Sequence, residues 1–305
     1  MAETLNFPGQ RGALRLDEPM ARHTSWRAGG RVERLYLPAD LEDLVAFLRQ
    51  LPPGEPLVFV GLGSNLLVRD GGLRGTVVLT HAAAKRPELL LGCVYAEAGV
   101  ASPKVARFAA RNDLAGAEFL AGVPGSVGGA LAMNAGCYGS ETWDIVERAV
   151  TIDRRGNLLS REKSEFEISY RHCAVRQGAR LGQDEWFVAA YFRLAQGDGE
   201  ASRARIKEFL SRRIATQPLQ LPNAGSVFGN PIADHAARLI EACGLKGLEH
   251  GGARVSEKHA NFIVNPKGAA KAADIEWLIT TVRARVLDQT GIDLQPEVRI
   301  VGEAA

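Results

Sequence analysis

The stretch at residues 121–139 reads AGVPGSVGGALAMNAGCYG and contains six glycines, one proline and no charged side chain. Glycine has a low helix preference and proline lacks a backbone donor, so we expect this run to be irregular and not helical. It is also too apolar for a solvated linker. We therefore interpret it as backbone that folds closely around a ligand.

An earlier segment, residues 58–68, has a similar character and reads VFVGLGSNLLV. An apolar strand leads into a Gly-Ser-Asn turn, and a second apolar run follows. Glycine lets main-chain N–H groups approach a ligand, and Ser64 and Asn65 add donors, so the turn suits anionic oxygens such as a pyrophosphate. A simple tight hairpin around Gly61 and Gly63 is the alternative, and the turn alone favours neither interpretation.

Composition narrows the class of protein. The 305 residues include 37 basic and 35 acidic side chains, and 46% of them are hydrophobic, as in ordinary globular proteins. The net charge of +2 argues against a surface that wraps nucleic acid. No apolar run is as long as a membrane span, and the N-terminus, with Glu3 and Pro8, lacks a signal-peptide core, so we expect a cytoplasmic protein. The four cysteines are scattered without a CxxC pair, so we expect reduced thiols and no metal site.

Periodicity and turn signals divide the chain into three predicted domains, residues 1–84, 85–200 and 201–305. In the first, Asp40 caps a helix that precedes the strands of residues 57–68. Strands and helices follow one another without a regular βαβ alternation, which predicts an α+β fold.

The second and third domains carry further helix and strand signals. Ser102 and Pro103 supply a cap and a first-turn proline for a helix that leads into the glycine-rich run. Strands are expected between residues 150 and 195. The third domain is expected to hold an Arg-rich helix, a helix that ends at Cys243, and a long helix with one apolar face that ends before Gly291.

Several segments resemble the UDP-N-acetylenolpyruvoylglucosamine reductases, the MurB flavoenzymes of bacterial cell-wall synthesis. The matching segments are HTSWRAGG (23–30), GLGSNLLVRDGG (61–72), AGVPGSVGGA (121–130), MNAGCYG (133–139), SYR (169–171), NAGSVFGNP (223–231), GGARVSEKHANFIVN (251–265) and PEV (296–298). One glycine turn would be weak evidence, whereas this ordered series spans almost the whole chain and is specific.

The resemblance implies a fold, an activity and a cofactor. The first two domains would form a vanillyl-alcohol-oxidase-type (PCMH-type) FAD-binding unit of two subdomains, and the third would be an α+β substrate-binding domain. NADPH would reduce a tightly bound FAD, which would then reduce the enolpyruvyl group of UDP-N-acetylglucosamine-enolpyruvate. We expect a monomer that binds neither nucleic acid nor membrane. Residues 172–195 show no obvious insertion, which is similar to the shorter family type that lacks a tyrosine loop.

The resemblance also assigns three catalytic residues, and each assignment has a chemical reason. An enol ether accepts hydride only if the negative charge that develops toward its carboxylate is stabilised, and Arg171 would supply the cation, with Glu297 beside it. Ser226 would donate a proton to the alpha carbon. Without the resemblance, a strand-edge arginine, a turn serine and a solvated glutamate would be the ordinary interpretations.

Further residues carried over from the family divide into two groups. The expected cofactor-binding residues are Gly61, Gly63, Ser64, Asn65, Leu66, Val123, Pro124, Gly125, Ser126, Gly128, Gly129, Asn134 and Gly136. The expected substrate-binding residues are Tyr170, Arg212, Arg213, Asn230 and His259. Gly229 stands where many relatives carry Lys, Arg or Gln, so one substrate-facing side chain is missing here.

Two other functions remain open from the sequence. A different FAD-dependent sugar oxidase or dehydrogenase on the same scaffold would share the glycine segments but not the three catalytic residues. A non-catalytic nucleotide-binding protein would need no flavin, so visible flavin absorbance separates it from both enzymes.

Overall fold

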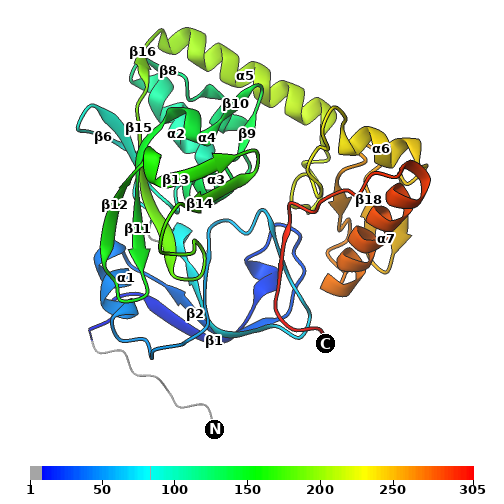
Figure 1. Cartoon of the computed structure of the whole chain (residues 1–305), viewed down its shortest axis with the longest axis horizontal. Coiled ribbons are helices and arrows are strands. Elements are labelled where there is room, and N and C mark those ends of the chain that lie inside the picture. Colours follow the sequence, from blue (N-terminus) through cyan, green and yellow to red (C-terminus); the bar gives the residue numbers. More distant parts are fainter. Residues whose placement is uncertain (1–8, 83) are drawn as a thin grey trace. The chain divides into compact units, whose positions relative to one another are not determined.

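The computed structural model describes residues 9–82 and 84–305 (Figure 1), so the expectation for the N-terminus around Glu3 and Pro8 lies outside the described residues. These residues form two compact units. The first unit comprises residues 9–16, 34–61, 75–82 and 84–207, and the second comprises residues 17–33, 62–74 and 208–305. The division into three domains stays a prediction.

A five-stranded antiparallel sheet forms the centre of the first unit, in the order β12-β11-β15-β7-β6. Its strands are β6 Glu88–Leu90, β7 Cys93–Glu97, β11 Val146–Asp153, β12 Leu158–Glu162 and β15 Glu185–Phe192. The middle strand, β15, is buried at every position but one. This sheet confirms the strands expected between residues 150 and 195.

Short elements surround this sheet in the first unit. The helices are α2 Ser102–Arg111, α3 Val127–Ala132 and α4 Thr142–Ile145, with 3-10 turns η2 Thr80–Ala82, η3 Glu118–Gly122 and η4 Lys163–Glu165. The paired short strands are β8 Leu114–Ala115 with β16 Ala195–Gln196, β9 Gly136–Cys137 with β10 Ser140–Glu141, and β13 Phe166–Ser169 with β14 His172–Val175.

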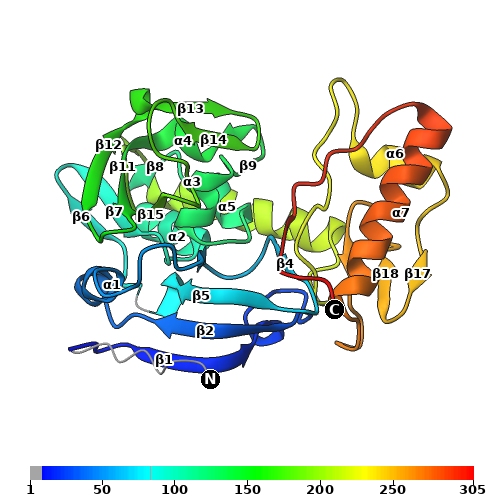
Figure 2. The ribbon, with the colours of Figure 1, turned by 60° about the horizontal axis from the view of Figure 1, so that its bottom comes forward.

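A second sheet has the order β1-β2-β5-β3, and Figure 2 shows β1, β2 and β5 side by side. The strands are β1 Ala13–Pro19, β2 Arg31–Leu37, β3 Leu57–Val60 and β5 Leu73–Leu79, with the turn η1 Met20–Arg22 after β1. The boundaries between the two units fall inside β1, β2 and β5. Helix α1, Leu41–Leu48, begins at the predicted cap, because the Asp40 side chain accepts a hydrogen bond from the Asp43 amide.

The second unit contains a small sheet and two packed helices. The sheet has the order β17-β18-β19, formed by Glu249–His250, Ala253–Val255 and Ile263–Val264. The helices are α6 Ala236–Ala242 and α7 Ala272–Thr290, while α5 Gly199–Thr216 crosses the unit boundary. Strand β4 Leu66–Val68 pairs in parallel with the last strand, β20 Arg299–Val301.

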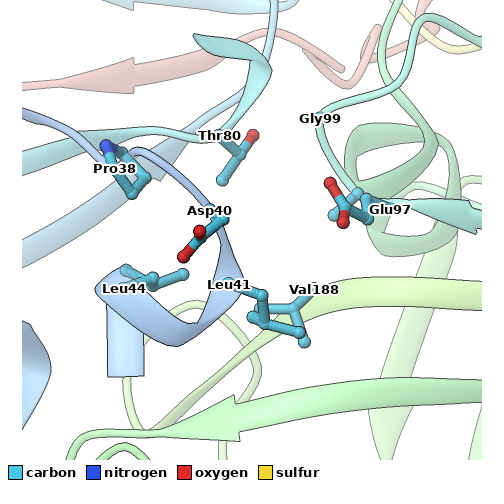
Figure 3. A pocket seen from close by; sticks show the side chains of 9 residues that line it. Pro38, Asp40, Leu41, Leu44, Thr80, Glu97, Gly99 and Val188 are labelled. Carbon is cyan, nitrogen blue, oxygen red and sulfur yellow. The ribbon is translucent and has the colours of Figure 1, made fainter. Parts of the chain in front are cut away.

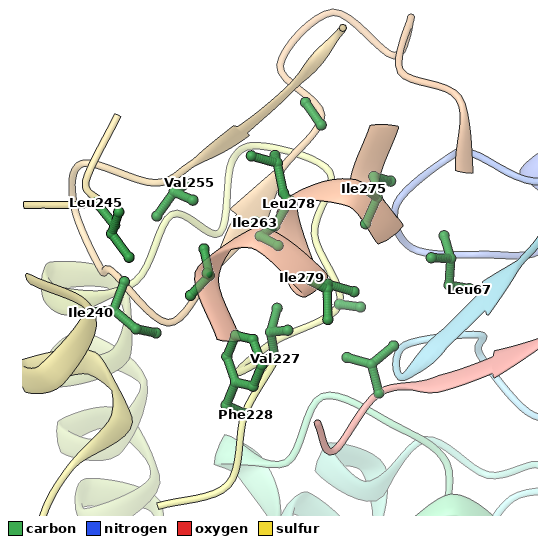
Figure 4. Packing of buried hydrophobic residues seen from close by; sticks show 14 of the residues in the cluster. Leu67, Val227, Phe228, Ile240, Leu245, Val255, Ile263, Ile275, Leu278 and Ile279 are labelled. Atoms are coloured by element: carbon green, nitrogen blue, oxygen red, sulfur yellow. The ribbon is translucent and has the colours of Figure 1, made fainter. Parts of the chain in front are cut away.

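The core of the second unit confirms the apolar face predicted for the long helix. The buried face of α7 consists of Ile275, Leu278, Ile279, Val282 and Val286, together with Ala272. Figure 4 shows three of these side chains beside Val227, Phe228 and Ile263. The helix ends at Gly291, which has a φ of 73° in the left-handed region that glycine adopts without strain.

Two expectations for local structure are corrected, and one alternative is excluded. The hairpin left open for residues 58–68 does not form, because β3 pairs with β5 and β4 pairs with β20. Part of the glycine-rich run is helical after all: α3 buries Val127, Ala130 and Leu131, and this packing outweighs the low helix preference of glycine. The cap of α2 is Ala101, one residue earlier than expected, since the Ser102 amide donates to the Gly125 carbonyl.

The mixed order of helices and strands confirms an α+β fold. Within the described residues, no helix combines the length and the apolar composition that crossing a bilayer requires.

Candidate functional site

The backbone of the glycine-rich run lies along the end of β7 and the start of α2 in the first unit. The Val127 amide donates to the Val100 carbonyl at 2.8 Å, and the Gly128 amide donates to the Ala98 carbonyl at 2.8 Å. A Cβ placed on Gly128 would lie 2.9 Å from the Ala98 Cβ, closer than carbon atoms pack. The packing of the protein therefore accounts for glycine at this position.

Gly129, the next residue, differs from its neighbour. A Cβ placed there would meet only the Ser126 Oγ among its neighbours, at 3.8 Å, which is an ordinary contact. Protein atoms thus leave room beside Gly129, as a cofactor that contacts the backbone would require.

The structure brings the start of the Gly-Ser-Asn segment to this run. Gly61 and Ser126 both belong to the first unit, and a Cβ on Gly61 would clash with the Ser126 Oγ. The His81 Nδ1 lies 2.8 Å from the Gly61 carbonyl, and because a carbonyl can only accept, Nδ1 carries the proton. Two of the predicted cofactor residues, distant in sequence, are therefore neighbours.

Asn134 holds the end of the run in place. It is 1% exposed, and its φ of 40° lies in the left-handed region, which asparagine tolerates better than most residues. Its Nδ2 donates to the Glu141 carboxylate at 2.6 Å and to the Ser169 carbonyl at 3.1 Å, and its Oδ1 accepts from the Trp143 amide at 3.1 Å. The side chain thus links the run to strand β13, which precedes the predicted catalytic arginine.

Arg171 lies in the turn between β13 and β14, and not on a strand as expected. Ser169 pairs with His172, so Tyr170 and Arg171 form a two-residue turn. Arg171 has a φ of 55°, a conformation that costs an L-residue roughly 1–2 kcal/mol. Its Nη2 donates to the Gly136 carbonyl at 3.2 Å, and its guanidinium lies 5.0 Å from the centre of the Tyr170 ring. Arg171 is thereby placed against the last part of the glycine-rich run.

The rest of the Gly-Ser-Asn turn belongs to the second unit. The Gly63 carbonyl accepts from the Ser25 amide at 3.0 Å, and a Cβ on Gly63 would clash with the His23 carbonyl. The Asn65 Nδ2 donates to the Glu297 carbonyl at 3.0 Å, and the Asn65 carbonyl accepts from the Arg299 amide at 3.1 Å. Asn65, a predicted cofactor residue, thus contacts the backbone of a predicted catalytic residue.

Ser226 and Glu297 lie on two backbone segments that pair within the second unit. The Glu297 amide donates to the Val227 carbonyl at 2.8 Å, and the Gly229 amide donates to the Gln295 carbonyl at 2.9 Å. The Ser226 side chain is exposed, while Val227 is buried in the core. The structure therefore brings two of the three predicted catalytic residues together in one unit.

Gly229 lies beside the Glu297 carboxylate. A Cβ on Gly229 would lie 3.3 Å from the Glu297 Oε1, so a longer side chain at this position would begin next to that group. As a glycine, residue 229 places no side chain beside the Glu297 carboxylate.

The predicted substrate-binding residues of the second unit have different surroundings. Arg212 and Arg213 lie near the end of α5, where the Arg213 Nε donates to the Gln217 Oε1 at 2.8 Å. The Asn230 Oδ1 accepts from the Ala236 amide at 3.1 Å, at the start of α6. Burial lowers the pKa of His259, and its Nδ1 is buried without a hydrogen-bond partner in the described part of the chain.

A small pocket in the first unit is lined in part by Ala98, whose carbonyl accepts from the Gly128 amide. It holds about 30 Å³, enough for one or two water molecules, and its lining includes Asp40, Leu44, Thr80, Glu97 and Val188 (Figure 3). None of the predicted site residues lines it, so we do not assign it to the reaction. Among residues 9–82 and 84–305, no cluster of three or more His, Cys, Asp or Glu side chains could hold a metal ion.

Comparisons with known proteins decide between the functions left open by the sequence. A family model described as FAD binding domain matches residues 32–161, and one described as UDP-N-acetylenolpyruvoylglucosamine reductase, C-terminal domain, matches residues 217–301. A reductase of that name from Nitrosospira multiformis is 57% identical, with 99% of this chain and 92% of the relative covered. The one from Methylococcus capsulatus is 59% identical, with 96% and 95% covered. The chain belongs to the UDP-N-acetylenolpyruvoylglucosamine reductase (MurB) family.

A solved structure agrees with the family. The crystal structure of MurB from Thermus caldophilus has a TM-score of 0.77 and 30% identity, and the match covers 95% of this chain and 98% of that one. The expected FAD-binding fold with a MurB C-terminal domain is thereby confirmed.

The sequence left open whether Asn261 contacts a ligand or has a buried structural role. Asn261 is 4% exposed, and its side chain hydrogen-bonds both backbone groups of Phe228. These hydrogen bonds give Asn261 the buried structural role, with a backbone partner that the sequence alone does not reveal.

Proposed function

We propose that this protein catalyses the NADPH-dependent reduction of UDP-N-acetylglucosamine-enolpyruvate to UDP-N-acetylmuramate with bound FAD, in the synthesis of peptidoglycan precursors. The observation that carries this function is the identity of 57–59% to reductases of this name over nearly the whole chain. The pairing of the Ser226 and Glu297 segments gives the activity a structural basis.

The residues present fit a flavin held by backbone groups. Residues 121–139 carry no charge, and the space beside Gly129 is open to a ligand. Bound FAD supplies hydride transfer between NADPH and the enolpyruvyl group. Main-chain N–H groups of the turn at Gly63 and Ser64 suit its pyrophosphate, and Val123, Pro124 and neighbouring residues would border its rings. The remaining predicted cofactor residues are Gly61, Asn65, Leu66, Gly125, Ser126, Gly128, Gly129, Asn134 and Gly136.

Three side chains would carry the chemistry at the substrate. The Arg171 guanidinium would stabilise the negative charge that develops toward the enolpyruvyl carboxylate, and Glu297 would act beside it. The Ser226 hydroxyl would then give its proton to the alpha carbon, because a carbanion-like carbon is basic enough to accept it from a weak acid. The left-handed conformation of Arg171 supports its role, since strained backbone occurs preferentially at functional sites.

Substrate recognition would depend mainly on cations and amides. Arg212 or Arg213, with Asn230, would bind the diphosphate, because guanidinium groups bind phosphate oxygens bidentately. Tyr170 and His259 would contact the remainder of the substrate. The neutral form of His259 that its burial favours suits a hydrogen bond to the sugar better than an ion pair with the diphosphate.

Finer properties belong to the same proposal. Strands β14 and β15 occupy half of residues 172–195 and leave residues 176–184 between them, which supports the shorter family type without a tyrosine loop. We further propose a cytoplasmic monomer with domains at residues 1–84, 85–200 and 201–305.

One assay tests the function against its alternative. The purified protein should show flavin absorbance and should oxidise NADPH only when UDP-N-acetylglucosamine-enolpyruvate is present, with little oxygen consumption. Ser226→Ala should retain flavin but lose turnover. Substrate-independent NADPH oxidation with matching oxygen uptake would instead favour an oxidase on the same scaffold.

A further inference from the structure

Asn261 contacts the backbone on the carboxyl side of Ser226 at three points. Its Oδ1 accepts from the Phe228 amide at 2.9 Å, and its Nδ2 donates to the Phe228 carbonyl at 2.8 Å. Its own carbonyl accepts from the Val227 amide at 2.9 Å. The side-chain amide thus binds both polar backbone groups of Phe228, as a neighbouring strand would.

The loop that carries Ser226 depends on such contacts because it lies outside any helix or strand. On its amino side, the Asn223 Oδ1 accepts from the Gly225 amide at 2.9 Å, and Gly225 has a φ of 76°. On its carboxyl side, the Phe228 side chain is 2% exposed and packs in the core shown in Figure 4. The exposed serine is therefore held between two anchored backbone positions.

The same backbone segment is also hydrogen-bonded to the segment that carries Glu297. The Val227 carbonyl accepts from the Glu297 amide at 2.8 Å, while the Val227 amide donates to Asn261. One peptide segment is therefore hydrogen-bonded to Asn261 on one side and to the Glu297 segment on the other. A shift of Phe228 would move Ser226 and alter the backbone next to Glu297 together.

We propose that Asn261 is a positioning residue for the reduction, which holds the Ser226 hydroxyl at the alpha carbon of the substrate. This inference rests on the proposed function, in which Ser226 donates the proton. The amide is 4% exposed and is engaged at both its oxygen and its nitrogen by Phe228, so Asn261 acts through the loop and not by touching the substrate. Proton transfer demands placement of the donor within a fraction of an ångström, which explains a buried amide at this point.

Asn265 provides a matched control four residues away. It is fully buried, its Nδ2 donates to the Trp26 carbonyl at 2.9 Å, and its Oδ1 accepts from the Ala270 amide at 3.1 Å. Its side chain therefore makes the same kind of hydrogen bonds to backbone as that of Asn261, in the same unit, but none to the Ser226 loop. The Asn265 backbone amide donates to the Pro222 carbonyl at 2.9 Å, and an alanine at this position keeps that bond. Asn265→Ala should lower the thermal stability of the holoenzyme as Asn261→Ala does.

The test separates the two half-reactions in the anaerobic holoenzyme by stopped flow. Reduction of the flavin by NADPH should stay close to the parent rate in Asn261→Ala. Reoxidation by UDP-N-acetylglucosamine-enolpyruvate should slow by on the order of 10²-fold, the effect of a donor displaced by about 1 Å. Asn265→Ala should leave both rates near those of the parent. Asn261→Asp keeps an acceptor for the Phe228 amide but sets a second acceptor oxygen against the Phe228 carbonyl, so it too should slow reoxidation and not flavin reduction, and it tests the proposal even if Asn261→Ala folds poorly.

A double-mutant cycle completes the test. In a Ser226→Ala background, Asn261→Ala should slow reoxidation much less than it does in the parent, because the hydroxyl it positions is gone and only the effect on the Glu297 segment remains. Equal slowing of both half-reactions, the same loss in Asn265→Ala, or fully additive losses in the cycle would overturn the proposal. Unimpaired reoxidation in Ser226→Ala alone would instead overturn the proton-donor role on which the proposal rests.

Discussion

The adjacent residues Gly128 and Gly129 differ in how much space the protein leaves for a side chain. A Cβ on Gly128 would press on Ala98, whereas one on Gly129 would make an ordinary contact with Ser126. Both lie in the first turn of α3. The protein's own packing requires the first glycine, and only a ligand could require the second.

We predict opposite effects for the two alanine substitutions. Gly128→Ala should lower the free energy of unfolding of the apoprotein by about 1–3 kcal/mol through overpacking. Gly129→Ala should raise it by up to ~0.5–1 kcal/mol, because alanine favours helix, and yet should weaken FAD binding. Urea unfolding of the apoprotein and the flavin content after purification measure the two effects. Parent-like flavin retention in Gly129→Ala would show that the cofactor does not approach this backbone.

Sequence could identify these residues as a group but could not separate their roles. The motif predicted Gly61 and Gly128 as cofactor glycines, yet each faces a protein atom that arrives from a distant segment, Ser126 and Ala98 respectively. Asn65 was predicted from its donors, but the partner of its Nδ2, the Glu297 carbonyl, lies 232 residues away. Residue type thus indicates capacity for a contact, and only the fold supplies the partner.

Helix α1 is held to strand β2 by a buried carboxylate. Asp43 is 2% exposed and accepts from the Arg11 amide at 2.7 Å, the Tyr36 hydroxyl at 2.6 Å and the Ala39 amide at 2.9 Å. Tyr36 also stacks on Phe47 of the same helix, with ring centres 3.7 Å apart. Burial alone would raise the pKa of Asp43, but the hydrogen bonds outweigh it and hold the pKa below its usual value.

This pKa shift predicts a pH dependence of stability. The unfolded state takes up a proton near pH 4, before the folded state does, so the stabilisation is complete above that pH and is lost as the pH falls through the lowered folded pKa. Asp43→Asn should lower the free energy of unfolding at pH 7 by about 1–3 kcal/mol. Urea unfolding between pH 3 and 7 should show a flatter acid limb for the variant. Identical acid limbs would mean that Asp43 is not the group that titrates.

Elements with strong local signals were predicted best. The apolar face of α7 repeats with the helical period and ends at a glycine, so no distant information is needed. The pairing of β3 with β5 and of β4 with β20 was missed, because parallel partners are joined by a crossover and not by a hairpin turn, so no local turn signal identifies the pair. Helix α3 was missed because the burial of its apolar residues outweighs the low helix preference of its glycines, and burial cannot be read from the local sequence.

At the scale of the whole molecule, each of the two units is built from several separate stretches of the chain. The second unit takes residues 17–33 and 62–74 from the amino-terminal part, and Trp26 donates to the Ile263 carbonyl at 2.7 Å within it. Arg171 belongs to the first unit, while Ser226 and Glu297 belong to the second. A division by sequence position alone does not anticipate this, because local patterns do not report which distant segments associate.

The edge strand β6 bears on the oligomeric state of the protein. Leu89, Leu90 and Leu91 are exposed at the end of β6, which lies at the edge of the five-stranded sheet. An apolar edge can add a strand from a second chain, but β6 is only three residues long, and short edge strands discourage such pairing. The left-handed φ of 55° at Leu91 ends the extended backbone directly after β6.

We therefore expect a monomer with a protein mass of 32.8 kDa by light scattering across micromolar concentrations. A mass twice as large that Leu90→Lys reduces to the monomer would contradict this prediction and would identify β6 as the interface.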